Sequence, residues 1–228
     1  MGSDREELFK KKRGQRKKRK EDAKRKAPYR YLIVCEGKKT EPNYFEGIER
    51  KINAQYAQSI RVEEQIEIQI EGTGRNTNDL VGYTEYIVNR SMPFGDIWVI
   101  FDKDSFSDDQ FNSAIEQANN KGYHVGWSNE AIELWFLLHF EYLDAAITRE
   151  QYNDKLTKYF TQLGLGKYVK NMPDIFDIVM KYGSLDQAIK RSQKLLKIHE
   201  ELGNINSKAK MKPATNVYVL VSELSQYF

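Results

Sequence analysis

Cysteine is almost absent from this chain of 228 residues, which contains Cys35 alone. One cysteine excludes an intrachain disulfide framework, and three scattered histidines give no zinc-ligand spacing. No apolar run approaches the roughly 20 residues that a membrane-spanning helix needs, and the chain does not open with a secretory pattern. From these absences we expect a reducing, cytoplasmic setting and no membrane partner.

Acidic residues are scarce in the first 30 positions, which hold 14 Lys and Arg against 5 Asp and Glu. Apolar residues are also scarce after Phe9, so we expect residues 1–28 to form a disordered basic arm. Such an arm would contact nucleic-acid phosphates without reading sequence; the alternative is a solvated tail that touches the acidic body. The candidate contacts are Lys10, Lys11, Lys12, Arg13, Arg16, Lys17, Lys18, Arg19 and Lys20.

The rest of the chain alternates strand and helix signals up to about residue 145. "RYLIVC" and "DIWVIF" are continuous apolar runs typical of strands covered on both faces, and "YHVGWS" predicts another strand. Ile66, Ile68 and Ile70 alternate with polar residues, which indicates an edge strand with one wet face. Helical spacing predicts the connecting helices at about 41–56, with Thr40 as its cap, 78–89 and 109–121.

Together these signals predict an α/β domain at residues 29–145, with a mostly parallel four-stranded sheet flanked by helices. "SNEAIELWFLLHF", which follows the fourth strand, is expected to form a buried helix of ten or more residues. Residues 146–228 show helical spacing only. We therefore expect a helical C-terminal region that packs on the α/β domain or next to it.

Acids follow the two most apolar strands. Glu36 comes directly after the first strand, and Asp102 and Asp104 come at the end of the third. Ligands of open parallel sheets bind beyond the carboxyl ends of the strands, so the three carboxylates converge if these strands are neighbours. On an extended segment, residues i and i+2 point the same way, which would direct Lys103 elsewhere.

Several carboxylates at one point raise one another's pKa and need a counter-charge. A hard divalent cation such as Mg²⁺ meets that need, because it prefers oxygen ligands. Glu130 and Glu133, near the start of the helix after the fourth strand, can add a further acid. Taken singly, Glu-Gly and Asp-x-Asp are ordinary turn sequences; their placement after two buried strands favours a metal site.

Four segments carry a resemblance to a known family: "LIVCEGKKTEPNYF", "WVIFDKDSF", "SNEAIELWFLLHF" and "KPATNVYVLVSEL". From about Lys10 to Phe228 the chain resembles RloB-like proteins, which are related to the Toprim domains of overcoming-lysogenization-defect (OLD) nucleases. The Glu-Gly and Asp-x-Asp pair is shared by Toprim proteins in general, whereas the last two segments are more specific to RloB-like chains.

The resemblance implies a Toprim-like fold and hydrolysis of nucleic-acid phosphodiesters with one or two Mg²⁺ or Mn²⁺ ions. It implies Glu36, Asp102 and Asp104 as the acidic set, with Glu36 as a metal ligand or a general base. Glu133 matches a further family acid, while Glu130 stands where the family commonly has proline. Lys38 also departs from the family, which is commonly acidic at that position.

The resemblance further implies a component of bacterial anti-phage, abortive-infection defence that works with an ATPase of the ABC/SMC-like type. This chain has no G-x-x-x-x-G-K-[ST] loop of its own, and "EGTGRNT" is better explained as a plain turn. A catalytically inactive adaptor that binds nucleic acid and the ATPase is the alternative. A primase or topoisomerase is disfavoured, because 228 residues leave no room for the separate domain that carries a nucleophilic tyrosine.

Three other residues near these acids have two open interpretations. Lys39 either stabilises phosphate charge in the active site or is an ordinary surface lysine. Ser128 and Asn129 either orient a ligand or cap the helix that follows them.

Overall fold

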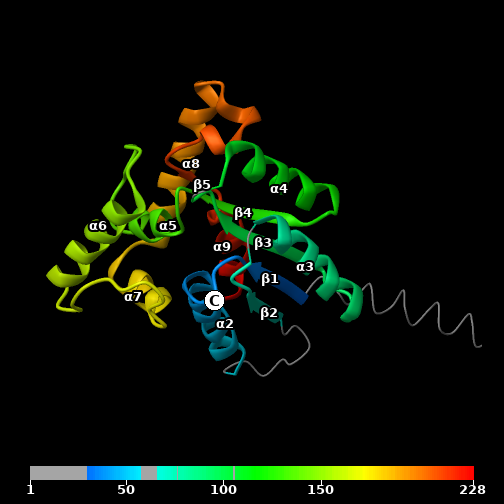
Figure 1. The fold of residues 1–228 in the computed structure, drawn as a ribbon. Helices are drawn as coiled ribbons and strands as arrows, with labels where there is room; N and C mark the ends of the chain where they lie inside the picture. Colours follow the sequence, from blue (N-terminus) through cyan, green and yellow to red (C-terminus); the bar gives the residue numbers. More distant parts are fainter. Residues whose placement is uncertain (1–29, 58–65, 76, 105) are drawn as a thin grey trace, which may run out of the picture.

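The computed structural model describes residues 30–57, 66–75, 77–104 and 106–228, so the predicted basic arm lies outside the described residues. The strands are β1 (Arg30–Cys35), β2 (Glu67–Gly72), β3 (Asp96–Asp102), β4 (His124–Asn129) and β5 (Ala214–Thr215). The helices are α2 (Thr40–Ala57), α3 (Thr77–Arg90), α4 (Asp108–Asn120), α5 (Glu133–Leu138), α6 (Arg149–Gln162), α7 (Ile175–Tyr182), α8 (Leu185–Glu201) and α9 (Tyr218–Leu224), as Figure 1 shows.

The strands form one sheet in the order β2-β1-β3-β4-β5. All neighbours are parallel except β4 and β5, which are antiparallel. The condition that the first and third strands be neighbours is therefore met, and the predicted edge position of the alternating strand is confirmed. The expected four strands were one too few, because β5 has two residues and is too short to show an alternating pattern.

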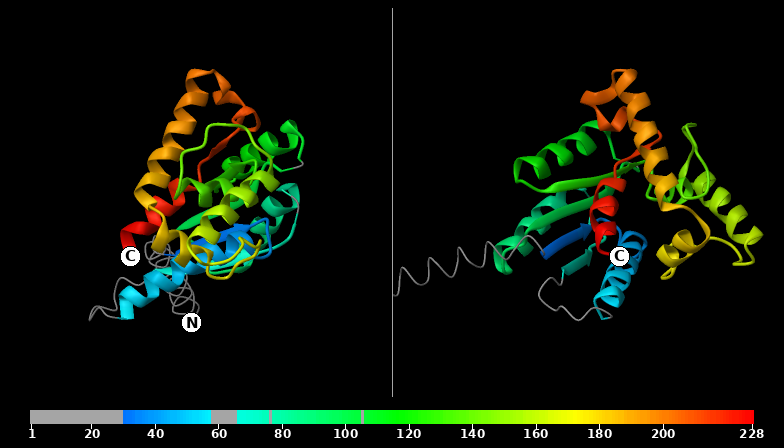
Figure 2. Two further views of the ribbon diagram at one scale, coloured as in Figure 1. Left: turned by 90° about the vertical axis from the view of Figure 1, so that its left-hand side faces the viewer. Right: turned by 180° about the vertical axis from the view of Figure 1, so that it is seen from behind.

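Helices cover both faces of the sheet, so each buried strand supplies two cores. In β1, Tyr31, Ile33 and Cys35 belong to the core on one face, and Leu32 and Val34 belong to the core on the other. This is the period of two that a strand imposes on its side chains. Helices α3 and α4 pack on the second face, and α2, α5 and α9 pack on the first (Figures 1 and 2).

The C-terminal region packs against the first face of the sheet. Leu220 and Val221 of α9 lie in the same core as Tyr31, and the Tyr31 hydroxyl donates a hydrogen bond of 2.6 Å to Glu223. The region is mainly helical, as expected, but it also returns β5 to the sheet edge. The domain boundary at residue 145 stays a prediction.

The apolar segment after β4 is a shorter helix than its composition predicts. Helix α5 spans Glu133–Leu138, and all six of its residues are buried. Ile132 and His139, the residues on either side, keep right-handed helical dihedrals, so the chain continues in turns beyond the six residues of α5. None of the helices in the described part of the chain combines the length and apolar character that crossing a bilayer requires.

Candidate active site

The acids at the ends of β1 and β3 meet, because the two strands are neighbours in register. Cys35 pairs with Ile100, and the backbone N–H of Glu36 donates to the Ile100 carbonyl at 2.9 Å. The carboxylate of Glu36 then accepts a hydrogen bond of 3.3 Å from the backbone N–H of Asp102. Parallel pairing thus brings together two acids that are 66 positions apart in the chain.

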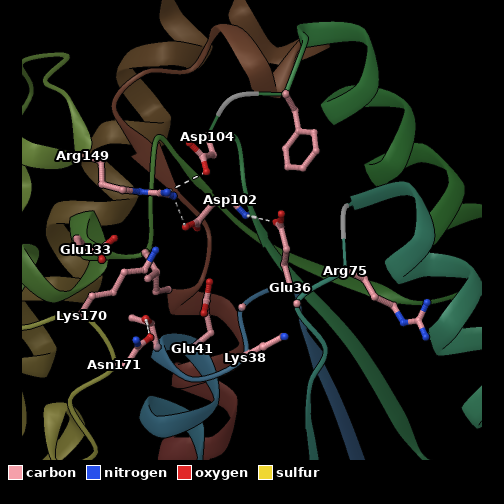
Figure 3. A pocket seen from close by; sticks show the side chains of 15 residues that line it. Glu36, Lys38, Glu41, Arg75, Asp102, Asp104, Glu133, Arg149, Lys170 and Asn171 are labelled. Atoms are coloured by element: carbon pink, nitrogen blue, oxygen red, sulfur yellow. Dashed lines mark hydrogen bonds and ion pairs between the residues drawn. The ribbon is translucent and has the colours of Figure 1, made fainter.

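A cavity of about 590 Å³ opens beyond these strand ends, and it is lined by both acidic and basic side chains. Figure 3 shows the carboxylates directed toward the same space from β1, α2, β3 and α5. The acids that line the cavity are Glu36, Glu41, Asp102, Asp104 and Glu133. The cations that line it are Lys38, Arg75, Arg149 and Lys170. All the acids in the set implied by the resemblance therefore face one cavity.

Arg149 bridges two of these acids, and the sequence interpretation missed it. Its Nη1 lies 2.8 Å from Oδ2 of Asp104, and its Nη2 lies 3.3 Å from Oδ2 of Asp102 (Figure 3). Arg149 is the first residue of α6, whose capping box joins Thr148 and Gln151. A cation in the first turn of a helix is unfavourable, because the helix dipole is positive at that end. The position of Arg149 in the sequence was therefore a signal that a negative charge elsewhere compensates it.

The backbone at Asp104 departs from the extended segment that the sequence suggested. Its φ is 36°, in the left-handed region that side chains other than glycine seldom adopt. The Asp104 N–H donates to the Glu130 carbonyl at 3.1 Å, which holds this turn against the end of β4. Lys103 does point away, as predicted, and its ammonium lies 3.3 Å from Asp108.

Burial and crowding make the negative charges of this site costly. Burial raises the pKa of Asp102 well above its ordinary value, and nearby Glu41 and Glu133 raise it further, while Arg149 works in the opposite direction. Burial also raises the pKa of Glu36 to about 7, although the hydrogen bond from Asp102 lowers it. Burial opposes the charge of Arg149 as well, but the surrounding carboxylates leave its pKa raised. The site is therefore short of positive charge.

Glu133 and Glu41 each have a carboxylate oxygen with no protein partner among the described residues. Glu133 is 1% exposed; its Oε1 accepts a hydrogen bond of 3.1 Å from the Tyr168 hydroxyl, and its Oε2 accepts none. Oε2 of Glu41 is buried in the same way, and burial raises the pKa of Glu41. Glu41 was not predicted as a site residue. An acid in the first turn of a helix is ordinarily explained by its favourable interaction with the helix dipole.

The two lysines after β1 are placed differently, and Lys39 takes the surface position that was one of its two interpretations. Lys39 is exposed and is not among the cavity residues, whereas Lys38 lines the cavity. The Lys39 carbonyl accepts the Asn43 N–H, so Lys39 begins the turn into α2. Helix α2 accordingly starts at Thr40, one residue before the predicted start, and Thr40 is not the cap. The Lys38 stem instead packs on Gly74, where an added Cβ would meet Lys38 Cε at 2.3 Å.

The side chains of three other candidates are used in structural contacts. Glu130 forms an ion pair with Lys212 and does not line the cavity, in contrast to Glu133. The Ser128 hydroxyl lies 3.0 Å from that of Thr215, and the Asn129 amide donates to the Ala209 carbonyl at 2.8 Å. Ser128 and Asn129 therefore fasten the C-terminal region to β4, and neither caps α5.

A segment before α7 supplies the remaining basic residue. Asn171 has a φ of 71°, its side chain lies 3.0 Å from the Thr40 hydroxyl, and its carbonyl accepts from Asn43 at 2.9 Å. These contacts hold the segment over the start of α2 and bring Lys170 to the cavity wall (Figure 3). The turn "EGTGRNT" likewise contributes Gly74 and Arg75 to the cavity, although the sequence suggested only a connection.

One observation favours a divalent metal at this site, and another opposes it. The donors are carboxylate oxygens, as Mg²⁺ and Mn²⁺ prefer, and two of them are buried without a partner. In the positions that the described side chains take, however, no group of three or more His, Cys, Asp or Glu could hold a metal ion. Arg149 supplies the positive charge between Asp102 and Asp104 in this arrangement.

Comparison with known proteins gives a family match. The family model described as RloB-like protein matches residues 31–224, a span that includes every residue of the cavity. No curated protein and no solved structure matches the chain significantly.

Proposed function

The chain belongs to the RloB-like family, and from that premise we propose that it is a metal-dependent nuclease of the Toprim type. Its reaction would be hydrolysis of phosphodiester bonds in DNA or RNA. The observation that supports this proposal is the meeting of carboxylates from β1, β3 and α5 in one cavity that is also lined by lysine and arginine. Acids that bind cations, next to bases that bind phosphates, are what phosphoryl chemistry requires.

The residues that would hold Mg²⁺ or Mn²⁺ are Glu36, Asp102, Asp104 and Glu133, and the unpartnered oxygen of Glu41 is a further donor. The chemistry that such ions supply when bound is polarisation of the phosphate and a lower pKa for the attacking water. Since Arg149 lies between Asp102 and Asp104, metal binding at these acids requires its guanidinium to turn aside.

The basic residues of the cavity would bind the substrate. A guanidinium released from Asp102 and Asp104 presents a planar set of donors that matches phosphate oxygens, so Arg149 can pass from the acids to the scissile phosphate. Lys38 and Lys170, on opposite walls, would bind the adjoining phosphates (Figure 3). Tyr168 keeps one oxygen of Glu133 in place through its hydroxyl.

Glu36 is suited to accept a proton from the attacking water. A base works best when its pKa is close to the operating pH, and burial raises the pKa of Glu36 to about 7. The N–H of Asp102 fixes one of its oxygens. The alternative role, as a ligand of a second metal ion, uses the same oxygens, so the two roles exclude each other in a single step.

We place this activity, by resemblance to RloB-like proteins, in a bacterial anti-phage system in the cytoplasm, with an ABC/SMC-like ATPase as partner. In such a system the chain would be the effector and the ATPase its sensor or gate. The competing proposal is an inactive adaptor. It is favoured by one observation, the Arg149 bridge, which neutralises the very acids that a nuclease needs.

Cleavage assays separate the two proposals. DNA and tRNA are incubated with the protein and Mg²⁺ or Mn²⁺, with and without an ABC/SMC-like ATPase of the kind that the resemblance implies. The nuclease proposal expects cleavage that Glu36→Ala and Asp102→Ala abolish and that the control Glu130→Gln retains, because Glu130 lies outside the cavity. Equal cleavage by all variants would show that Glu36 and Asp102 are not catalytic. No cleavage under any condition supports the adaptor.

Metal binding is measured separately from activity. Titration of the protein with Mn²⁺, followed by electron paramagnetic resonance, should show binding that Asp102→Asn weakens and Glu130→Gln does not. Binding that is unchanged in Asp102→Asn would place the ion elsewhere.

A further inference from the structure

Two stacked tyrosine rings flanked by two guanidinium groups form a row along α3; we call Arg75, Tyr83, Tyr86 and Arg90 the α3 strip. The Arg75 Cζ lies 4.5 Å from the centre of the Tyr83 ring. The rings of Tyr83 and Tyr86 are stacked, with centroids 6.2 Å apart and an interplanar angle of 15°. The Arg90 Cζ lies 4.1 Å from the centre of the Tyr86 ring.

One end of the α3 strip is at the candidate active site. Arg75 lines the cavity, and Figure 3 shows its side chain directed away from the carboxylates and toward α3. The helix that follows has 14 residues and is therefore about 20 Å long. Figure 1 shows α3 leading away from the carboxyl ends of the strands, so the members of the strip on α3 lie progressively farther from the cavity.

The other end is where the basic N-terminal segment joins the sheet. Arg30 opens β1, and its guanidinium donates to the Met92 carbonyl at 2.8 Å and lies 4.3 Å from the centre of the Phe94 ring. Met92 and Phe94 follow directly after Arg90, the last residue of α3. The α3 strip therefore connects the cavity with the attachment point of a segment that is rich in Lys and Arg.

Three members of the strip are exposed to solvent, whereas Tyr83 is half-buried and packs against the core beneath α3. Tyr86 is 51% exposed, and Arg75 and Arg90 are exposed. Glu85, an acid on the same helix, lies 2.9 Å from Lys121, the residue after α4, and is neutralised there. The strip thus presents cations and aromatic faces together, a combination that suits a polyanion with aromatic bases.

We propose that the α3 strip binds a single-stranded segment of nucleic acid that leads into the cavity. Bases can extend the row of tyrosine rings or replace a guanidinium on a ring, and the displaced arginine then pairs with a phosphate. A duplex hides the faces of its bases, so this surface selects single strands. The inference rests on the proposed function, because the bound strand is the substrate of that function.

The test is fluorescence anisotropy with a labelled oligothymidylate, using the full chain in EDTA so that no cleavage occurs. Tyr86→Ala should weaken binding about tenfold, because one base loses its stacking partner. Tyr86→Phe keeps the ring and removes only the hydroxyl that accepts a 2.6 Å hydrogen bond from Arg90, so it should lose much less affinity than Tyr86→Ala. Tyr182→Ala is the matched control, since Tyr182 is also exposed and lies beside a lysine, 5.0 Å from Lys181, but belongs to α7.

Salt titration gives a second measure. Replacing Arg90 by glutamine should lower the slope of log affinity against log salt by roughly 0.7, the contribution of one phosphate contact to a single strand. Circular dichroism must show the same helix content in all variants. The proposal is overturned if Tyr86→Ala binds like the unchanged protein, if Tyr182→Ala loses as much affinity, or if a duplex binds as tightly as the single strand.

These outcomes are distinct from those of the cleavage assay. Loss of binding in Tyr86→Ala, with no cleavage by the unchanged protein under any condition, supports the α3 strip and rejects the nuclease. Cleavage that depends on Glu36, with binding that is indifferent to Tyr86, supports the nuclease and rejects the α3 strip.

Discussion

The guanidinium of Arg149, on α6, lies 3.3 Å from Oδ2 of Asp102 at the end of β3, although the two residues are 47 positions apart. The same guanidinium reaches Asp104, so one cation balances two acids in a site that also contains Glu36 and Glu133. One side chain therefore balances the charge of both acids, and under the proposed function it would also limit the access of a metal ion to them.

Replacing Arg149 should separate metal affinity from activity. In Arg149→Met, Asp102 and Asp104 lose their counter-charge, so we expect Mn²⁺ to bind about tenfold more tightly without substrate. Cleavage should nevertheless fall, because the phosphate loses a bidentate partner. Calorimetric titration with Mn²⁺ and an initial-rate assay measure the two effects. Arg50→Met is the control, since Arg50 pairs with Asp177 outside the cavity; weaker Mn²⁺ binding in Arg149→Met would contradict the prediction.

Without metal, the free energy of unfolding should fall as the pH rises, because of the buried carboxyl group of Glu36. Because the pKa of Glu36 is raised to about 7 in the folded protein, the folded state holds a proton that the unfolded state releases between about pH 4.5 and 7. The stabilisation is present below that window and is lost as the pH rises through it. Glu36→Gln should therefore gain up to about 3 kcal/mol in unfolding free energy relative to the unchanged protein between pH 5 and pH 8.

Urea unfolding in EDTA at both pH values measures this difference. Glu130→Gln serves as the control, because Glu130 has Lys212 as a counter-charge. Addition of Mn²⁺ should reverse the order at pH 8, since the cation stabilises the charged carboxylate. A Glu36→Gln variant whose advantage is the same at pH 5 and pH 8 would show that the charge of Glu36 is not the cause.

Two buried tyrosines should respond differently to loss of the hydroxyl. Tyr168→Phe removes the hydrogen bond to Glu133 and leaves that buried carboxylate with less support, so we expect a loss of about 1–3 kcal/mol in stability. Tyr152 is also buried, but its hydroxyl has no partner among the described residues. Tyr152→Phe should be neutral or slightly stabilising. Thermal unfolding measures both, and equal effects would indicate that the Tyr168–Glu133 bond contributes nothing.

Adjacent lysines provide a test of the cavity wall. Lys38→Ala should lower kcat/KM by about tenfold, because a hydrogen bond to a charged group contributes roughly 1.5 kcal/mol or more. Lys39→Ala should change it by less than about twofold, since Lys39 is exposed and outside the cavity. Steady-state kinetics on one oligonucleotide compares the two variants. A larger loss in Lys39→Ala would favour the other interpretation of Lys39, in which it stabilises phosphate charge.

The sequence by itself determined the architecture and the principal acids. Apolar runs identified the buried strands, alternation identified the edge strand, and the position of Glu36 after one run and Asp102 after another predicted where they would meet. These inferences succeeded because strand periodicity and the direction of parallel strands are local or topological properties, which do not depend on exact side-chain positions.

Only the tertiary structure decided which other residues join those acids. Arg149, Glu41 and Lys170 come from α6, α2 and the segment before α7, and no spacing in the sequence relates these segments to one another. Lys38 and Lys39 were indistinguishable in the sequence, because the turn between β1 and α2 alone determines which side chain faces the cavity. β5 was likewise invisible, since its two residues acquire strand geometry only by pairing with β4. Contacts between segments far apart in the chain determine which side chains face the cavity and whether β5 pairs. Local sequence patterns do not reveal such contacts.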